Sequence, residues 1–168
     1  MTTRHAVVDS VLGELTLVAE GDALTGVYFA HHWYRPAADT FGPQVDSDDL
    51  LAEAKTQLTD YLGRERTNFE LPLAMHGDDM QRRVWHLLTT IAYGDTVTYG
   101  ELAAELADGS TAQEVGQAVG RNPLSIIVPC HRVVGKNGSL TGYAGGLKRK
   151  QFLLDLEEPA ESRAARLY

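Results

Sequence analysis

Cys130, the one cysteine of this 168-residue chain, is followed directly by His131 and Arg132. A thiol attacks as its thiolate, and with a free pKa of about 8.5 it needs a cation or a proton acceptor beside it to ionise near neutral pH. His131 and Arg132 are candidates for these roles by their position in the chain. The alternative is that Cys130 is a small core residue, which is the more common role of a lone intracellular cysteine.

Apolar β-forming residues lie on both sides of this triplet, at 126–128 and 133–134. This pattern predicts buried extended chain before and after the polar residues. A glycine-rich segment follows at 135–146, with Tyr143 as its one aromatic residue. Because the segment is not followed by a Lys-Ser or Lys-Thr pair at the spacing of a phosphate-binding loop, we expect it to form the wall of a pocket for a planar ligand.

Residues 1–76 are expected to form a small α+β domain. Alternating apolar and polar residues between 5 and 30, with turn signals at 13 and 20–22, predict two or three antiparallel strands. A helix is predicted from Ser47 or Asp48 to Gly63, since apolar residues recur there at helical spacing. Alternation at 69–73 predicts a last strand at the edge of the sheet, because Pro72 cannot donate a ladder hydrogen bond.

An irregular segment at 31–47 separates the strands from this helix and is expected to be a surface loop. It carries His31 and His32. Without a second thiolate or a suitably spaced carboxylate nearby, solvated loop histidines are favoured over metal ligands.

Residues 77–168 are expected to form a second, mostly helical domain, beginning with an amphipathic helix from 80 to 91. Two capping boxes, Thr98 with Glu101 and Ser110 with Gln113, each predict the start of a short helix. These two helices, joined by a turn at 108–109, have the outline of a helix-turn-helix. The second carries small residues that would let its backbone approach a neighbouring helix or a nucleic-acid groove. They are Ala112, Gly116, Ala118 and Gly120.

The last predicted helix, 148–157, has apolar residues on one face and Glu157 at its end. On this pattern alone, Glu157 is a solvated helix terminus, because glutamate is rarely buried without a partner.

The formal net charge of -8, taken over the whole chain, argues against nucleic acid as a partner. The charge is unevenly distributed, since residues 111–157 carry six Lys or Arg against three Asp or Glu. This segment is compatible with a local phosphate contact. A solvated surface of uneven charge is an equally good interpretation.

A single cysteine excludes an intrachain disulfide and any zinc site built on two thiolates, and it favours a reducing, cytoplasmic compartment. The start of the chain has no apolar signal region, and no run of apolar residues approaches the roughly 18 of a membrane span. We therefore expect neither a signal peptide nor a membrane segment.

Four motifs, in this order, resemble the O6-alkylguanine-DNA alkyltransferase family. They are Gly-Arg-Asn-Pro at 120–123, Pro-Cys-His-Arg-Val at 129–133, Thr-Gly-Tyr-Ala-Gly-Gly at 141–146 and Leu-Leu-Asp-Leu-Glu at 153–157. The match is dense from 80 to 157 and loose in the N-terminal half. The resemblance implies an α+β fold, with a ribonuclease H-like domain at 1–76 and a DNA-binding and alkyl-transfer domain at 77–168.

The resemblance also implies a chemistry. In this family a cysteine takes the alkyl group from O6 of guanine in DNA, and O4-alkylthymine is a further expected substrate; the transfer is irreversible and occurs once per molecule. Carried over, Cys130 is the nucleophile, His131 accepts its proton through a water, and Glu157 orients the histidine. Tyr99 would donate a proton toward the guanine, and Asn122 would tie the helix-turn-helix to the active-site segment.

The remaining binding residues are implied in the same way. The guanine pocket would be formed by Val133, Tyr143, Ala144 and Gly145. Double-stranded DNA would be bound through its minor groove, with the alkylated base flipped out of the stack. The residues expected to contact it are Thr98, Tyr99, Ala112, Gln113, Gly116 and Arg121. The resemblance implies no cofactor, no metal, no membrane, and a monomer when DNA is absent.

One position departs from the family pattern. Gln113 stands where the family has the arginine that fills the gap left by the flipped base. Glutamine is shorter and uncharged, and the predicted capping box would give it a second role. We therefore hypothesise weaker or differently organised base flipping, with Arg121 or a loop residue compensating.

Two other classes of function are weighed against repair. A damage-binding protein without transfer activity would be expected to lack the cysteine, and Cys130 is present. A cysteine hydrolase would need an oxyanion hole, for which the sequence offers no motif. Alkyl transfer is therefore favoured over both.

Overall fold

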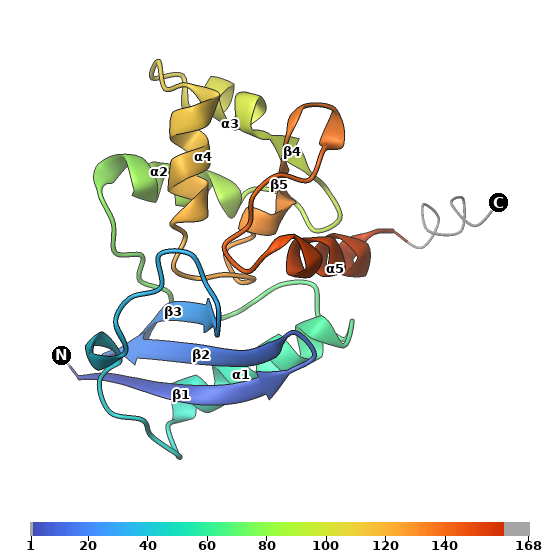
Figure 1. Cartoon of the computed structure of the whole chain (residues 1–168). Coiled ribbons are helices and arrows are strands. Elements are labelled where there is room, and N and C mark those ends of the chain that lie inside the picture. Colours follow the sequence, from blue (N-terminus) through green and yellow to red (C-terminus); the bar gives the residue numbers. More distant parts are fainter. Residues whose placement is uncertain (1, 160–168) are drawn as a thin grey trace.

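The computed structural model describes residues 2–159. Its N-terminal half is a three-stranded sheet with one long helix, and its C-terminal half, above the sheet in Figure 1, is mainly helical. The last helix, α5 (Leu147–Glu157), lies at the level where the two halves meet. The predicted α+β class, with a small sheet-plus-helix unit followed by a mostly helical one, is confirmed.

The sheet is an antiparallel meander, as the alternating pattern predicted. Its strands are β1 (Thr3–Ser10), β2 (Gly13–Glu20) and β3 (Ala23–Phe29), paired in that order. Because successive side chains of a strand point to opposite faces, Leu15 and Leu17 turn to the same face, and both are completely buried. Residue Val18 turns to the opposite face and packs in a small cluster with Tyr28 and Phe41, the last residue of the 3-10 helix η1 (Ala38–Phe41).

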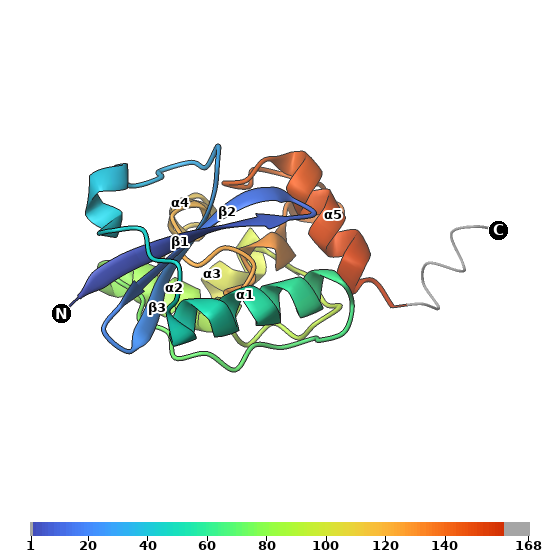
Figure 2. The ribbon, with the colours of Figure 1, turned by 90° about the horizontal axis from the view of Figure 1, so that it is seen from below.

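Helix α1 (Asp49–Leu62) runs alongside the strands, as Figure 2 shows. Asp48 caps it by accepting a hydrogen bond from the backbone N–H of Leu51 at 3.0 Å, and Gly63 follows its last residue, so both predicted ends are correct. The predicted strand at 69–73 is wrong. This segment makes only an isolated bridge at Leu73, because its neighbour β3 offers it just two backbone hydrogen bonds, both at Leu24.

The C-terminal half contains three helices in sequence, α2 (Asp79–Leu88), α3 (Tyr99–Leu106) and α4 (Ala112–Gly120). Helix α2 ends earlier than predicted, at Leu88. Ala107 ends α3 in the left-handed conformation, and α3 and α4 pack together as the predicted helix-turn-helix.

The cap of α4 differs from the prediction by one residue. Thr111 is the N-cap: its hydroxyl accepts from the N–H of Glu114 at 3.1 Å, and the Glu114 carboxylate accepts from the N–H of Thr111 at 3.0 Å. A carboxylate is favoured over an amide at this place because the helix N-terminus carries partial positive charge. Gln113 is therefore not used as a cap, and its side chain is available for another contact.

The chain before Cys130 is also not extended, contrary to the sequence pattern. Leu124 makes an isolated bridge to Val27, residues 125–128 form turns and a bend, and Ile126 has φ +73°, a region that β-branched residues rarely adopt. Cys130 opens a single 3-10 turn, η2 (Cys130–Arg132). The strand predicted after it is present as β5 (Val133–Val134), which pairs in parallel with β4 (Val97–Thr98).

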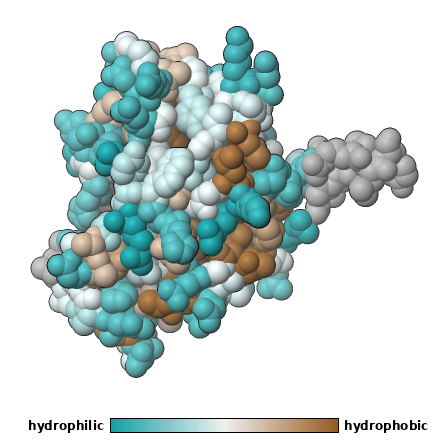
Figure 3. Space-filling model, viewed as in Figure 1, coloured by the Kyte–Doolittle hydropathy of each residue, from teal (hydrophilic) through white to brown (hydrophobic). Residues whose placement is uncertain are grey.

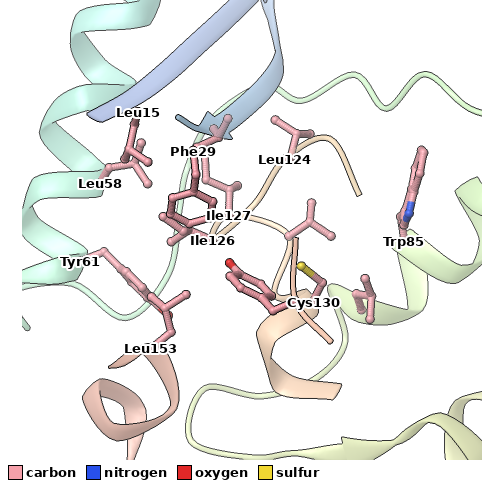
Figure 4. Close-up of a cluster of buried hydrophobic side chains, with 14 of the residues drawn as sticks. Leu15, Phe29, Leu58, Tyr61, Trp85, Leu124, Ile126, Ile127, Cys130 and Leu153 are labelled. Atoms are coloured by element: carbon pink, nitrogen blue, oxygen red, sulfur yellow. The ribbon is translucent and has the colours of Figure 1, made fainter. Parts of the chain in front are cut away.

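One continuous core joins the two halves. Figure 4 shows that side chains from β2, β3, α1, α2, the 124–130 segment and α5 converge on it, and Cys130 is among them. The bend at 123–127 is held to the sheet by a hydrogen bond from the N–H of Val27 to the carbonyl of Pro123, at 2.8 Å. The core thus places the cysteine segment directly against the N-terminal sheet.

On the face viewed in Figure 3, hydrophobic residues appear in separate groups among hydrophilic ones. In the described part of the chain, the exposed large hydrophobic residues are Val7, Val11, Trp33, Tyr34 and Leu147. Two of these, Trp33 and Tyr34, are adjacent in the loop after β3. No helix in residues 2–159 is long and apolar enough to cross a membrane.

Candidate active site

A pocket of about 530 Å³ opens beside Cys130. Its walls come from four separate parts of the chain. These are Trp33 and Tyr34 after β3, Tyr99 at the start of α3, one face of α4, and the loop at 141–144. The α4 face contributes Ala112, Gln113, Gly116 and Gln117. The glycine-rich segment is therefore part of a pocket wall, as the sequence predicted.

Cys130 is 4% exposed. Burial raises the pKa of its thiol to about 11, while a hydrogen bond from Asn122 and the positive charge of Lys150 act in the opposite direction. In the resting protein this thiol is protonated near neutral pH. Its reaction therefore requires a base that removes the proton when a substrate is bound.

His131 can act as that base. Its Nε2 lies 2.8 Å from Oε2 of Glu157, and its Nδ1 is buried with no hydrogen-bond partner among the described residues. Burial and the nearby charges of Arg132 and Lys150 hold the pKa of His131 well below its usual value, so the imidazole is neutral. A neutral ring that donates from Nε2 to a carboxylate has its lone pair on Nδ1, which is free to accept a proton.

Glu157 is buried and receives three hydrogen bonds from side chains. Two come from Arg132, from Nε to Oε1 at 2.7 Å and from Nη2 to Oε2 at 2.9 Å, and the third comes from His131. Burial raises the pKa of Glu157 to about 8, while a backbone hydrogen bond from Gly94 acts in the opposite direction. The bidentate guanidinium contact also favours the carboxylate form. The remaining nitrogen of Arg132, Nη1, donates to the carbonyl of Ile91 at 2.6 Å. Arg132 therefore bridges the segments around the site.

Lys150 of α5 is a second cation at the site. Its side chain is completely buried, and its Nζ donates to the carbonyls of Thr141 at 2.8 Å and Gly142 at 3.3 Å. Burial lowers the pKa of Lys150 to about 8. The ammonium group thus fixes the pocket loop and places a positive charge near Cys130.

Asn122 and Tyr99 fix two other sides of the pocket. The Asn122 side chain donates to the carbonyl of Val128 at 2.8 Å and accepts from the N–H of Leu124 at 3.0 Å, so it ties the end of α4 to the cysteine segment. The hydroxyl of Tyr99 accepts a hydrogen bond from Thr141 at 3.3 Å, and burial raises its pKa above the usual value. Tyr99 is therefore a protonated phenol that can donate.

Comparison with known proteins identifies the family. Two family models match in tandem, "6-O-methylguanine DNA methyltransferase, ribonuclease-like domain" over residues 3–75 and "6-O-methylguanine DNA methyltransferase, DNA binding domain" over residues 79–159. A Mycobacterium bovis methylated-DNA–protein-cysteine methyltransferase is 42% identical over 154 residues, which are 92% of each chain. The chain belongs to the 6-O-methylguanine DNA methyltransferase family.

Other members of the family agree. A constitutive methylated-DNA–protein-cysteine methyltransferase of Bacillus subtilis is 39% identical over 158 residues, covering 91% of this chain and 94% of the relative. The crystal structure of Mycobacterium tuberculosis OGT in complex with DNA superposes with a TM-score of 0.83 at 41% identity, covering 95% of this chain and 97% of that one. The expected ribonuclease-like N-terminal fold and the predicted family are confirmed.

The structure brings most of the predicted residues of this family member to one place. Cys130, Tyr99, Tyr143 and Ala144 line the pocket, and so do the expected DNA-contacting residues Ala112, Gln113 and Gly116. His131, Glu157 and Asn122 lie behind Cys130, buried.

Four predicted residues lie elsewhere. Val133 is fully buried in β5, and Gly145 packs against Phe29; neither lines the pocket. Thr98 uses its hydroxyl to cap α3. Arg121 follows α4, with its guanidinium carbon 3.9 Å from the centre of the Tyr34 ring.

The sequence pattern missed three residues of the site. Lys150 shares a helix face with the buried Leu153 and Glu157, and a lysine on an apolar face is a signal that could have identified it. Trp33 and Tyr34 are neighbouring aromatic residues in a polar loop, which gave no indication that they reach the other half of the chain. No group of three or more His, Cys, Asp or Glu suited to a metal occurs within residues 2–159.

Proposed function

We propose that this protein repairs alkylated DNA by moving the alkyl group from O6 of guanine to Sγ of Cys130, irreversibly and once per molecule. The observation that carries the proposal is Cys130 at the wall of a pocket, backed by a neutral His131 whose far nitrogen is held by Glu157. The proposal extends to O4-alkylthymine, which presents the same alkyl–oxygen bond on a smaller ring.

The transfer is a displacement at the alkyl carbon. The Cys130 proton passes through a water to Nδ1 of His131, the S–C bond forms, and the C–O6 bond breaks. Breaking this bond leaves its electron pair, and a negative charge, on the base. Tyr99 donates a proton that neutralises this charge, and Tyr99 then takes up a proton from solvent. Glu157 stabilises the histidine as it becomes positively charged.

A single turnover follows from the chemistry of the product. The sulfur of S-alkylcysteine is bound to carbon in a stable thioether, and a thiolate is a poor leaving group from an alkyl carbon. A second nucleophile would be needed to remove the group. Cys130 is the chain's one cysteine, so no second thiol is available in the same molecule.

DNA binding is proposed to use the small-residue face of α4. This helix would lie in the minor groove with Gly116 at closest approach, and the alkylated base would be flipped into the pocket. Gln113 lies on the rim of that pocket and would occupy the gap in the base stack, while Thr98 and Arg121 would contact the backbone.

The same proposal includes two domains, 1–76 and 77–168, and a monomer in the absence of DNA. We also place the protein in the cytoplasm, since a thiol that must stay reduced until it meets its substrate requires a reducing compartment.

The experiment is to incubate the protein with a duplex oligonucleotide that contains O6-methylguanine and to weigh the intact protein. One methyl group per molecule, located on Cys130 and stable to dialysis, supports transfer. The Cys130→Ser variant should gain no mass and should bind the duplex with unchanged affinity, measured by fluorescence anisotropy. Tight binding without an adduct would instead indicate a damage sensor, and repeated product release would indicate a hydrolase.

A further inference from the structure

We propose that Trp33, from the N-terminal half of the chain, determines the size of the O6 substituent that the pocket accepts, by holding Gly142 of the pocket loop in place. The inference rests on the alkyl-transfer function proposed above. In Figure 1 the chain that leaves β3 rises toward the C-terminal half before it returns to η1, and this excursion carries Trp33.

Trp33 is fixed at the pocket although it is 52% exposed. Its backbone N–H donates to the carbonyl of Ala144 at 3.0 Å, which ties the excursion to the pocket loop. The preceding His32 accepts the N–H of Phe29 through its Nδ1 at 3.2 Å. The following Tyr34 has φ +55° and stacks on Arg121. The residues before and after Trp33 in the chain are therefore both fixed by contacts, which a freely moving loop would lack.

The indole ring lies directly against the backbone of Gly142. A Cβ atom added to Gly142 would come within 2.9 and 3.0 Å of two carbons of the ring, closer than van der Waals contact allows. The carbonyl of Gly142 also accepts from Lys150. Gly142 is therefore held by the ammonium and packed against the indole, so the loop cannot move toward Trp33 unless the indole moves.

This arrangement limits the space available to a substituent. The pocket loop and Trp33 line the same pocket as Cys130, whose sulfur must meet the substituent's first carbon. A methyl group ends at that carbon, whereas a benzyl group extends several atoms further and requires the pocket loop to move aside. Discrimination by the fit of a substrate in an apolar pocket reaches about 10- to 200-fold for a single methylene.

The test compares two substrates in the same duplex, one with O6-methylguanine and one with O6-benzylguanine, by single-turnover rate. Trp33→Ala should raise the ratio of the benzyl to the methyl rate at least fivefold, and Trp33→Phe should raise it less. Val11→Ala, which removes an exposed side chain in the β1–β2 turn that does not line the pocket, should leave the ratio unchanged. An unchanged or lower ratio in Trp33→Ala would overturn the inference.

A double-mutant cycle separates this role from general stability. Gly142→Ala should slow both substrates in the parent protein, because its methyl group meets the indole, and should have at most one third of that effect in the Trp33→Ala background. Equal effects in both backgrounds would contradict the proposed contact. If the parent protein gained no adduct from either substrate, the proposed function itself would fail; an adduct with an unaltered ratio would refute only the role of Trp33.

Discussion

Glu157 holds together two residues that are adjacent in the chain but differ in their tasks. Arg132 uses two of its nitrogens on the carboxylate and a third on the carbonyl of Ile91, whereas His131 gives one N–H and leaves Nδ1 without a hydrogen-bond partner among the described residues. The interpretation of Glu157 as a solvated terminus is wrong for this reason. Its partners lie 25 and 26 residues earlier, beyond the reach of any periodicity within one helix.

The charge of Lys150 predicts a bend in the pH profile of alkyl transfer. The rate should rise with pH as the Cys130 thiol becomes easier to ionise, and should level off above about pH 8, where Lys150 loses the proton that its lowered pKa of about 8 releases. Single-turnover rates between pH 6.5 and 9.5 would measure this.

Two substitutions at the same position provide the controls. Lys150→Met should be slower than the parent protein below pH 8 and should show no bend, while Lys150→Arg keeps its charge throughout and should continue to rise. A parent profile without a bend would contradict the assigned role of the ammonium charge.

At the scale of elements, α4 shows how a local signal can be displaced by one residue. Both Ser110 with Gln113 and Thr111 with Glu114 satisfy the capping-box pattern, and the structure uses the second pair. Gln113 is therefore free at the pocket rim. Arg121 lies eight residues further, about 12 Å along a helix axis, and stacks on Tyr34, which argues against it as a substitute for the family's arginine.

A positive charge at position 113 should therefore strengthen DNA binding. Gln113→Arg is expected to lower the Kd for an undamaged duplex about threefold or more at 0.1 M salt, since each added phosphate contact releases a counterion. Gln117→Arg adds the same charge one turn along the same face and is the matched control. Binding equal to or weaker than that of the parent protein would contradict the hypothesis that Gln113 weakens base flipping.

The loop after β3 should be sensitive to acid. Both His31 and His32 were predicted to be solvated; His31 is exposed, but His32 is half-buried, and burial together with the charge of Arg35 lowers the pKa of His32 from 6.5 to about 4. The unfolded chain then binds more protons between these values. Stability contributed by neutral His32 is complete above pH 6.5 and is lost as the pH falls toward 4.

Urea unfolding at pH 7.5 and pH 5 would measure this effect. The parent protein should lose more stability between these two conditions than His32→Gln, whose amide oxygen can accept the same N–H without titrating. His31→Gln should follow the parent protein. Equal losses in the parent and in His32→Gln would show that another group is responsible.

For the molecule as a whole, what could be predicted from sequence depended on the distance over which each signal acts. Capping residues and apolar periodicity are local, and they located α1, α3, α4 and the strands to within a residue or two. Residues 69–73 were predicted to be extended because apolar and polar residues alternate there, and residues 126–128 because they are apolar β-formers. Phe69, Leu71 and Leu73 instead lie half-buried against the core, and residues 126–128 are buried within it, with no sheet pairing beyond the isolated bridge at Leu73. Trp33 reaches the site only through the packing of the two halves, which one sequence does not encode in any local pattern, whereas Lys150 was signalled by its position on an apolar helix face.

The continuous core predicts that the two halves unfold together. Leu15→Ala, at a completely buried position of β2, should lower the free energy of unfolding by about 2–5 kcal/mol. In the Trp33→Phe variant, fluorescence reports Trp85 alone, which is buried in the other half and donates to the carbonyl of Ala118 at 2.8 Å, and it should give the same midpoint as far-UV circular dichroism. Separate midpoints would mean that the halves are independent, and Val11→Ala should shift neither.

The burial of Cys130 also protects its thiol from reaction with small electrophiles. A thiol with a pKa of about 11 and 4% of its surface exposed is almost never a thiolate and is rarely met by small electrophiles in solution. Glutathione and other free thiols, with ordinary pKa values, would consume such electrophiles first. The molecule therefore keeps its one reactive atom intact in a cell under alkylating stress, until a base that fits the pocket delivers the alkyl group to it.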